Sequence, residues 1–168
     1  STLIGFLDDK YELKQKQKLF YFLILGFVWA YYKSDITGLN IYFIFSFISY
    51  TAIFVFLVLF FNQIDGINGL ATGTFFICLL YVYITGTNLI LLFPVIFSVL
   101  AYFFINVNGK IGIQGDSGSF FMGSFLAIVY SKSIEFSELG LVFFILGPLV
   151  FDICSAPIIR FYYKINLS

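Results

Sequence analysis

Histidine is absent from the 168 residues of this sequence, only two cysteines occur, and charged residues make up 11%. The lack of histidine excludes a Ser-His-Asp hydrolase, which needs an imidazole as its general base. Cys78 and Cys154 lie in separate apolar segments, so we expect buried, reduced thiols rather than a disulfide framework. The formal net charge is zero, which gives no indication of a nucleic-acid partner.

Apolar residues are abundant instead: 61% of the chain is hydrophobic, 23% is aromatic, and the mean hydropathy is +1.01. These values are typical of integral membrane proteins. A helix that crosses the ~30 Å hydrocarbon core needs ~20 apolar residues. We therefore predict an all-α fold, a polytopic bundle of transmembrane helices that forms one integral membrane domain over residues 1–168. The six predicted spans cover residues 19–32, 39–61, 69–85, 88–106, 118–131 and 139–160.

Basic residues predict the side of the membrane on which each loop lies, because Lys and Arg of short loops collect on the cytoplasmic side. Six spans would place four segments on one face, residues 1–18, 62–68, 107–117 and 161–168. That face, with the end of the last span, holds seven of the nine basic residues, namely Lys10, Lys14, Lys16, Lys18, Lys110, Arg160 and Lys164. We expect it to be cytoplasmic and to collect six carboxylates, those of Asp8, Asp9, Glu12, Asp65, Asp116 and Asp152.

The first polar stretch, FNQIDGINGLATG at residues 61–73, interrupts two long apolar segments. Its glycines allow a tight turn and close approach to a ligand, and Asn62, Asp65 and Asn68 recur every third residue, close to one helical face. One interpretation is a turn in which Asp65 or Asn68 caps the next helix. The other is a binding site, because an ionisable group at membrane depth is costly and is typical of functional positions.

The second stretch, NGKIGIQGDSGSFFMGSFLA at residues 108–127, contains GDSGS, a string similar to one around the nucleophile of trypsin-like proteases. Ser119 stands where a nucleophile elbow needs glycine, which together with the missing histidine excludes that chemistry. Asp116 or Ser117 can cap a helix that begins here. A helix N-terminus flanked by glycines is also a phosphate site, at which Asp116 would hold a cation.

The third stretch, GFLDDKYELKQKQKLF at residues 5–20, combines acidic and basic side chains. Asp9 and Glu12 have the spacing of a capping box, and the lysines that follow are also typical of a basic cluster at a membrane surface. The alternative is a site in which Asp8 and Asp9 bind Mg²⁺ or abstract a proton while the lysines neutralise phosphates.

In this order and at these spacings, the three stretches resemble the motifs of the polyprenyl-phosphate N-acetylhexosamine-1-phosphate transferases, glycosyltransferase family 4. GFLDDKYELKQKQKL is similar to the aspartate-rich segment of the family, NQIDGINGLATG to its N-x-x-D-G-x-D/N-G-x-A motif, and KIGIQGDSGSFFMG to its G-D-x-G-S-x-x-x-G motif. GPLVFDICSAPIIR resembles the segment before the last conserved loop. The family includes phospho-N-acetylmuramoyl-pentapeptide transferase and the undecaprenyl-phosphate GlcNAc-1-phosphate transferases.

The resemblance implies a multi-pass enzyme of the bacterial inner membrane with a cytoplasmic active site. Such an enzyme transfers a sugar 1-phosphate from a UDP-N-acetyl sugar to undecaprenyl phosphate and releases UMP, in the synthesis of cell wall or O-antigen. One aspartate of the pair would deprotonate or position the lipid phosphate, and the cofactor would be Mg²⁺, or Mn²⁺ in its place. The implied site residues are Asp8, Asp9 and Lys18 for catalysis, Asn62 and Asp116 for the metal, and Asp65, Asn68 and Asp152 for the substrate.

Two positions depart from the family pattern: Glu12 stands where many members have a third aspartate, and Asn68 where many have aspartate. The donor sugar therefore stays open, as does the oligomeric state, with a homodimer as one option. Helices before Ser1 and a His-rich loop after Ser168 are expected in such an enzyme, so we interpret the sequence as part of a longer protein. A membrane transporter that uses intramembrane carboxylates is the alternative function, and a buried pair with Arg160 is the alternative role of Asp152.

Cysteine-accessibility labelling tests the topology that the basic residues predict. Single cysteines at Gln17, Gln63 and Gln114, in a background without Cys78 and Cys154, are expected to react from the cytoplasmic side alone. Reagents that cannot cross the membrane, added to intact cells and to inverted vesicles, report the side of each position. If two of the three cysteines reacted from opposite sides, the segments would not share a face and the expected site would not form.

Overall fold

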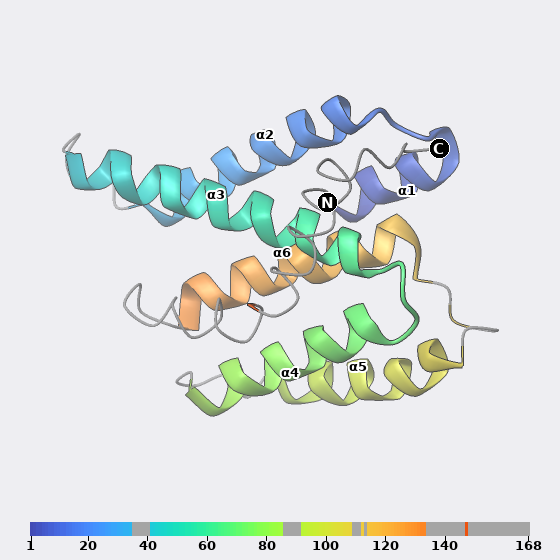
Figure 1. The fold of residues 1–168 in the computed structure, drawn as a ribbon. Helices are drawn as coiled ribbons and strands as arrows, with labels where there is room; N and C mark the ends of the chain where they lie inside the picture. Colours follow the sequence, from blue (N-terminus) through green and yellow to red (C-terminus); the bar gives the residue numbers. More distant parts are fainter. Residues whose placement is uncertain (35–40, 86–91, 109–111, 113, 134–146, 148–168) are drawn as a thin grey trace, which may run out of the picture. The chain divides into compact units, whose positions relative to one another are not determined.

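The computed structural model describes residues 1–34, 41–85, 92–108, 112, 114–133 and 147. Its helices are α1 (Thr2–Tyr11), α2 (Gln15–Lys33), α3 (Ile41–Ile64), α4 (Leu70–Thr85), α5 (Leu92–Val107) and α6 (Gly115–Ser133) (Figure 1). No strand occurs among the described residues, so the predicted all-α class is confirmed. All these helices belong to one compact unit, Ser1–Ile134.

The helices α2 to α6 coincide with the first five predicted spans, with ends shifted by a few residues. Only α3, with 24 residues and a mean hydropathy of 2.5, is long and apolar enough to cross a membrane in the part of the chain that is described. The helices α4 and α5 are apolar but shorter. The span at 139–160 lies outside the described residues, as do Asp152 and Cys154. The polytopic bundle and the single domain over 1–168 therefore stay predictions.

The segment before the first predicted span, residues 1–18, was expected to be a loop and instead contains a helix. The helix α1 ends at Tyr11, Glu12 adopts the left-handed conformation with φ of 50°, and α2 begins at Gln15. Asp9 and Glu12 thus lie at the end of a helix, and their interpretation as a capping box is wrong. A helix this short is marginal on its own. Packing of α1 against α6 stabilises it, which local sequence does not reveal.

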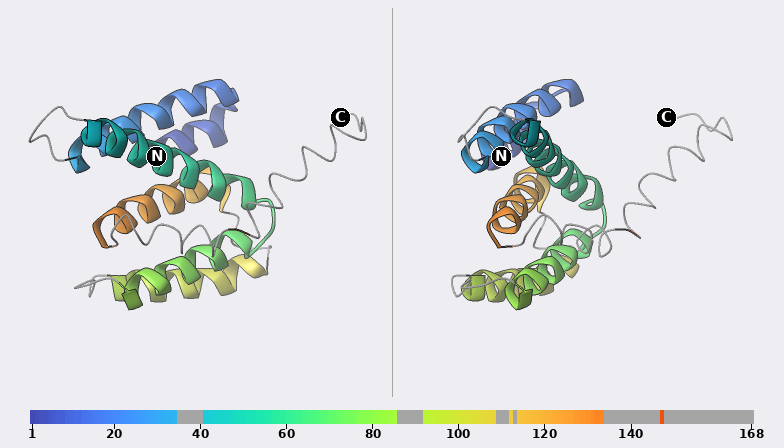
Figure 2. Two further views of the ribbon diagram at one scale, coloured as in Figure 1. Left: turned by 60° about the vertical axis from the view of Figure 1, so that its left-hand side comes forward. Right: turned by 90° about the vertical axis from the view of Figure 1, so that its left-hand side faces the viewer.

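The helix α6 packs against three other helices, α1, α3 and α4. Figures 1 and 2 show α6 between α3 and α4, and α4 and α5 side by side. Two glycines allow the close approaches. A Cβ atom on Gly5 of α1 would overlap the backbone of Ser117, and a Cβ atom on Gly123 of α6 would lie 2.5 Å from the Cα atom of Val58 on α3. The start of α6 is therefore held against the backbone of α1, and its middle against the backbone of α3.

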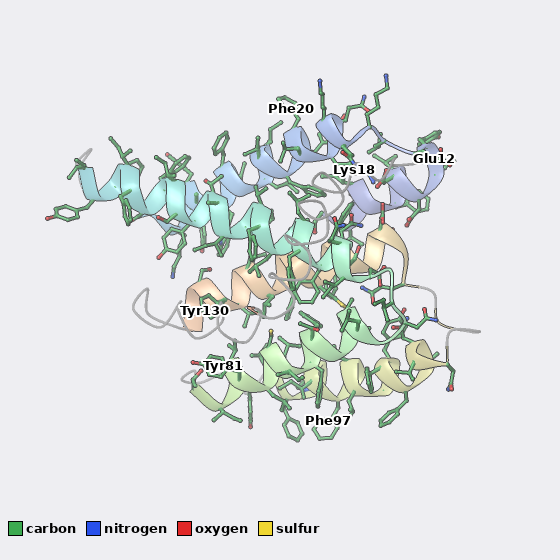
Figure 3. All side chains as sticks on the ribbon, viewed as in Figure 1. Glu12, Lys18, Phe20, Tyr81, Phe97 and Tyr130 are labelled. Atoms are coloured by element: carbon green, nitrogen blue, oxygen red, sulfur yellow. The ribbon has the colours of Figure 1, made fainter. Side chains whose placement is uncertain are left out.

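Phenylalanine rings occupy both the interior and the outer surface of this unit. Phe22 of α2 contacts Phe120 of α6 edge to face, with ring centres 4.6 Å apart, and both rings are fully buried. Phe20 and Phe97, by contrast, point away from the neighbouring helices, as Figure 3 shows, and each is more than half exposed. Exposed aromatic rings on several helices suit a hydrocarbon environment, in which they cause no unfavourable hydration.

Candidate functional site

A lysine in the first turns of α2 lies between carboxylates from two other helices. The Lys18 ammonium forms ion pairs with Asp8 of α1 and with Asp116 of α6, the second at 3.2 Å between Nζ and Oδ2. Figure 3 shows Lys18 beside α1. Asp8 is 4% exposed, and its Oδ1 accepts a hydrogen bond from the Leu13 amide at 2.8 Å. We call Lys18, Asp8, Asp116 and the neighbouring Asp9, Asn62 and Asp65 the Lys18 cluster.

Burial and neighbouring charges oppose each other in this cluster. Burial disfavours the charged form of Asp8, but hydrogen bonding with Asp116 and Lys18 and the Lys18 charge outweigh it and lower the pKa of Asp8. Burial likewise disfavours the Lys18 ammonium, yet its bonds to the two carboxylates raise its pKa. Burial first, and the Asp8 carboxylate next, raise the pKa of Asp116. Lys18 and Asp8 are therefore charged at neutral pH, whereas Asp116 takes up a proton more readily than Asp8.

The second oxygen of Asp116 is bound from α3. Asn62, in the last turn of α3, donates from Nδ2 to Asp116 Oδ1 at 2.7 Å and to Ser119 Oγ at 3.4 Å. Ser119 in turn donates from Oγ to the Asp116 carbonyl at 3.2 Å. The Asp116 side chain is thus directed to Lys18 and Asn62, and it lies in the first turn of α6 rather than at the cap position. Its interpretation as a helix cap is wrong.

The carboxylate of Asp9, at the end of α1, meets the start of α6. Its Oδ1 accepts a hydrogen bond from the Asp116 amide at 3.0 Å. Its Oδ2 accepts hydrogen bonds from the Ser117 amide at 3.3 Å and from the Ser117 hydroxyl at 2.9 Å. Ser117 therefore donates its hydroxyl to another helix instead of capping its own. The two adjacent aspartates bind different partners, Asp8 the ammonium of Lys18 and Asp9 the first turn of α6.

The residues expected to contact the substrate differ in their placement. Asp65 follows α3, and burial, together with the charges of Asp116 and Asp9, raises its pKa to about 6. Asn68 is exposed on the turn before α4 and forms no hydrogen bond with another described residue. Neither side chain caps α4, so that interpretation of the turn is wrong. Asp152 lies outside the described residues, and its role stays a prediction.

A buried amide that was not predicted to belong to the site joins two of the polar stretches. Asn106, at the end of α5, is 3% exposed. Its Oδ1 accepts hydrogen bonds from the Gly69 amide at 2.8 Å and from Thr72 Oγ1 at 3.2 Å, and its Nδ2 donates to the Gly112 carbonyl. The Gly69 turn has a φ of 81° and is thereby fixed to the segment that leads into α6. In the sequence, the only sign of this contact was one amide side chain at the C-terminal end of the apolar stretch 88–106.

An apolar cavity of about 480 Å³ lies between α4, α5 and α6, lined among others by Phe75, Val95, Phe121 and Met122. Tyr102 and Gln114 also line it and are among its few polar side chains. An apolar wall cannot compensate a phosphate for the loss of its hydration. The charged part of a phosphate ligand would therefore bind on the Lys18 side of α6 rather than in this cavity.

The residues expected to hold Mg²⁺ can be compared with the preferences of that ion. Mg²⁺ prefers carboxylate and amide oxygens, keeps several waters, and binds through one or two carboxylates together with substrate phosphates. Asp116 and Asn62 offer oxygens of this kind and contact each other directly, and Asp65 adds a second carboxylate within electrostatic range. Among the described residues, no three His, Cys, Asp or Glu side chains are close enough to enclose a metal. These residues fit a cation that takes its remaining ligands from substrate phosphates and water.

Comparison with known protein families adds an independent finding. The family model described as Glycosyl transferase family 4 matches residues 1–134. The matched range contains all three polar stretches and every helix of the described unit. None of the curated proteins and none of the solved structures matches the chain.

Substitution of Asp65 tests the electrostatics of the cluster. Because its folded pKa of about 6 exceeds its usual value of 3.8, the folded protein retains a proton that the unfolded chain loses, so ionisation destabilises the fold as pH rises from about 4 to about 6. The neutral Asp65→Asn variant should therefore gain thermal stability over the wild type at pH 7.5 but not at pH 4. Unfolding midpoints in detergent with EDTA measure this. An equal difference at both pH values would contradict the raised pKa.

Proposed function

Because the chain belongs to glycosyl transferase family 4, we propose that it transfers a sugar 1-phosphate from a UDP-N-acetylhexosamine to undecaprenyl phosphate at the cytoplasmic face of a bacterial inner membrane. The family match makes the chain a transferase that acts on sugar phosphates. In the proposed reaction an oxygen of the acceptor phosphate forms a bond to the β-phosphorus of the donor. The bond from that phosphorus to the bridging oxygen breaks, and UMP leaves with that oxygen.

The observation that carries this proposal is the ammonium of Lys18 between carboxylates of α1 and α6. Two phosphate-bearing substrates repel each other, so the reaction depends on positioning and on positive charge. Lys18 stays protonated because Asp8 and Asp116 raise its pKa against the effect of burial. Its side chain is about one-fifth exposed, so part of Lys18 is open to solvent. Lys18 is therefore the group that contacts phosphate during transfer.

Asp8 holds Lys18 rather than removing a proton from the acceptor. A carboxylate with a lowered pKa is a weak base, and Asp8 has such a pKa because of its bonds to Asp116 and Lys18. The acceptor does not require a strong base, because the second pKa of a phosphate monoester is about 6, so most of it is a dianion at neutral pH. The role of Asp8 is to fix the position of the ammonium.

Asp116 and Asn62 would hold Mg²⁺, or Mn²⁺, which when bound neutralises the diphosphate of the donor and the charge on the departing phosphate. Each Asp116 oxygen is bound by one donor and keeps a lone pair for a cation. Asn62 keeps the carboxylate in a fixed orientation. Asp65 and Asn68, on the turn beside this pair, are assigned to the uridine end of the donor.

The placement of the carboxylates also favours the transferase over a transporter. A transport pathway needs polar groups near the middle of the membrane. Asp8 and Asp9 lie at the end of α1, Asp65 follows the end of α3, and Asp116 lies at the start of α6. The described carboxylates are thus at helix ends, which supports a reaction at the membrane surface.

A direct test is incubation of the full-length protein in membranes with undecaprenyl phosphate, Mg²⁺ and one of several UDP-N-acetyl sugars. Release of UMP together with a lipid-linked sugar diphosphate is expected with one donor or a few donors. If none of the sugars yields UMP while the protein is folded in the membrane, the proposed reaction is wrong. The donor that reacts identifies the sugar.

Substitution of Lys18 separates a phosphate contact from a general basic surface. Lys18→Ala should lower transfer by ~10²-fold, as expected for the loss of a group that stabilises transition-state charge. The exposed Lys14 and Lys16 serve as matched controls, and their alanine variants should retain most of the activity.

Loss of Lys18 also leaves Asp8 buried without its cation, which destabilises a protein on its own. The double variant Asp8→Asn/Lys18→Ala removes that charge, so it should regain thermal stability without regaining activity. Recovery of transfer in the double variant, or equal small losses for all three lysines, would show that Lys18 is not a phosphate contact.

Asp116→Asn tests the metal role, because the change keeps the size of the side chain but removes its charge. A hard cation bound by few protein oxygens depends strongly on that charge. The variant should insert and fold normally, since Lys18 keeps Asp8 as a partner, and should lose nearly all transfer, with partial rescue at most by excess Mg²⁺ or Mn²⁺. The exposed Glu12, changed to Gln, is the control. Turnover of Asp116→Asn at the wild-type rate in ordinary Mg²⁺ would rule out Asp116 as a cation ligand.

A further inference from the structure

The two aspartates at the end of α1 are adjacent in sequence but lie in different surroundings. Asp8 is 4% exposed and forms an ion pair with Lys18. Asp9 is exposed, and its carboxylate lies at the first turn of α6, where it accepts hydrogen bonds from the Asp116 amide, the Ser117 amide and the Ser117 hydroxyl at 2.9–3.3 Å. Both oxygens of Asp9 are thus bound by one short segment.

The start of α6 lacks a cap of its own. The first amides of a helix have no acceptor within the helix, and a side chain just before or within the first turn usually supplies one. Here the Asp116 side chain binds Lys18 and Asn62, and the Ser117 hydroxyl donates outward. Gly115, the first residue of α6, has a φ of 63°, and a Cβ atom there would lie 3.2 Å from Asp9 Oδ2. Asp9 therefore caps α6 from another helix, with glycine leaving it room.

We propose that Asp9 is a positioning residue, which acts through the first turn of α6 to set the place of the Asp116 carboxylate, and that it neither exchanges a proton with the acceptor nor binds the cation. This inference rests on the proposed transfer reaction. It follows from the contacts, since the Asp116 amide that Asp9 binds belongs to the same residue whose side chain contacts Lys18 and Asn62. A shift of this turn would move the Asp116 carboxylate away from both partners.

The test compares Asp9→Asn with Asp9→Ala in the full-length protein. Asparagine keeps one acceptor oxygen for the Asp116 amide and an NH₂ group that can donate to the Ser117 hydroxyl, whereas alanine keeps neither, a loss that costs about 1 kcal/mol at a cap. Asp9→Ala should therefore lose transfer about five- to tenfold, and Asp9→Asn should stay within about threefold of the wild type. Glu12→Gln is the matched control for loss of an exposed carboxylate on the same segment. If Asp9→Asn lost as much activity as Asp9→Ala, or ~10²-fold or more, the charge itself would be needed and the positioning role would be wrong.

A second readout separates positioning from a general loss of folded protein. A displaced Asp116 should raise the Mg²⁺ concentration for half-maximal transfer in Asp9→Ala, and Asp9→Asn should restore it. A smaller folded fraction would lower the maximal rate without moving that concentration. An unchanged Mg²⁺ requirement in Asp9→Ala would overturn the link to Asp116.

Hydrogen exchange tests the cap without any activity. In Asp9→Ala the Asp116 and Ser117 amides should exchange faster than in the wild type, and in Asp9→Asn the Asp116 amide should stay protected, because one acceptor oxygen remains. Ser117→Ala alone should lower transfer a little. Added to Asp9→Ala it should cause no further loss, because both changes remove the contact between the two side chains. Unchanged exchange in Asp9→Ala would disprove the cap. If the wild type released no UMP, the proposed reaction would fail, and exchange would still decide whether Asp9 caps α6.

Discussion

The ammonium of Lys18 is the charge on which the arrangement of the other polar groups depends. Asp8 is almost fully buried, and a buried carboxylate is tolerated only with a partner of opposite charge. The same ammonium reaches Asp116, whose other oxygen is bound by Asn62. One positive charge thereby connects α1, α2 and α6, and Asn62 extends the connection to α3. The remaining negative groups, Asp9 and Asp65, lie around a centre whose geometry is already fixed.

The helix α6 turns this local arrangement into a property of the whole described unit. Its first turn carries Asp116, accepts the cap from Asp9 and places Ser119 beside Asn62. Its remaining length packs against α3 and α4, and Gly123 allows contact with the α3 backbone. The polar end of α6 therefore cannot shift without disturbing the apolar packing below it. On the other side of α6, the cavity near Gln114 and Met122 is apolar, so the helix separates surroundings of opposite character.

Much of this arrangement follows from the sequence, because apolar runs predict helices and charge bias predicts which helix ends share a face. The all-α class and five of the helices were predicted in this way, and Asp8, Asp9, Lys18, Asn62, Asp65 and Asp116 were predicted to converge. The contacts could not be predicted. Whether Asp9 binds a cation or caps a distant helix depends on the approach of α1 to α6 at Gly5, which no local pattern encodes. The helix α1 was missed because packing rather than propensity stabilises it, and Asn106 because one amide in an apolar stretch has no distinctive spacing.

The long sequence separation within the Lys18 cluster bears on how the chain is assembled in a membrane. Asp8 and Lys18 belong to the neighbouring helices α1 and α2 and can pair once both have been synthesised. Asp116 follows Lys18 by 98 positions, and its amide follows Asp9 by 107. The ion pair with Lys18 can thus keep the Asp8 carboxylate paired before Asp116 is present. A chain interrupted before α6 would keep the pair of Lys18 and Asp8, while the Asp9 carboxylate would have no helix to cap.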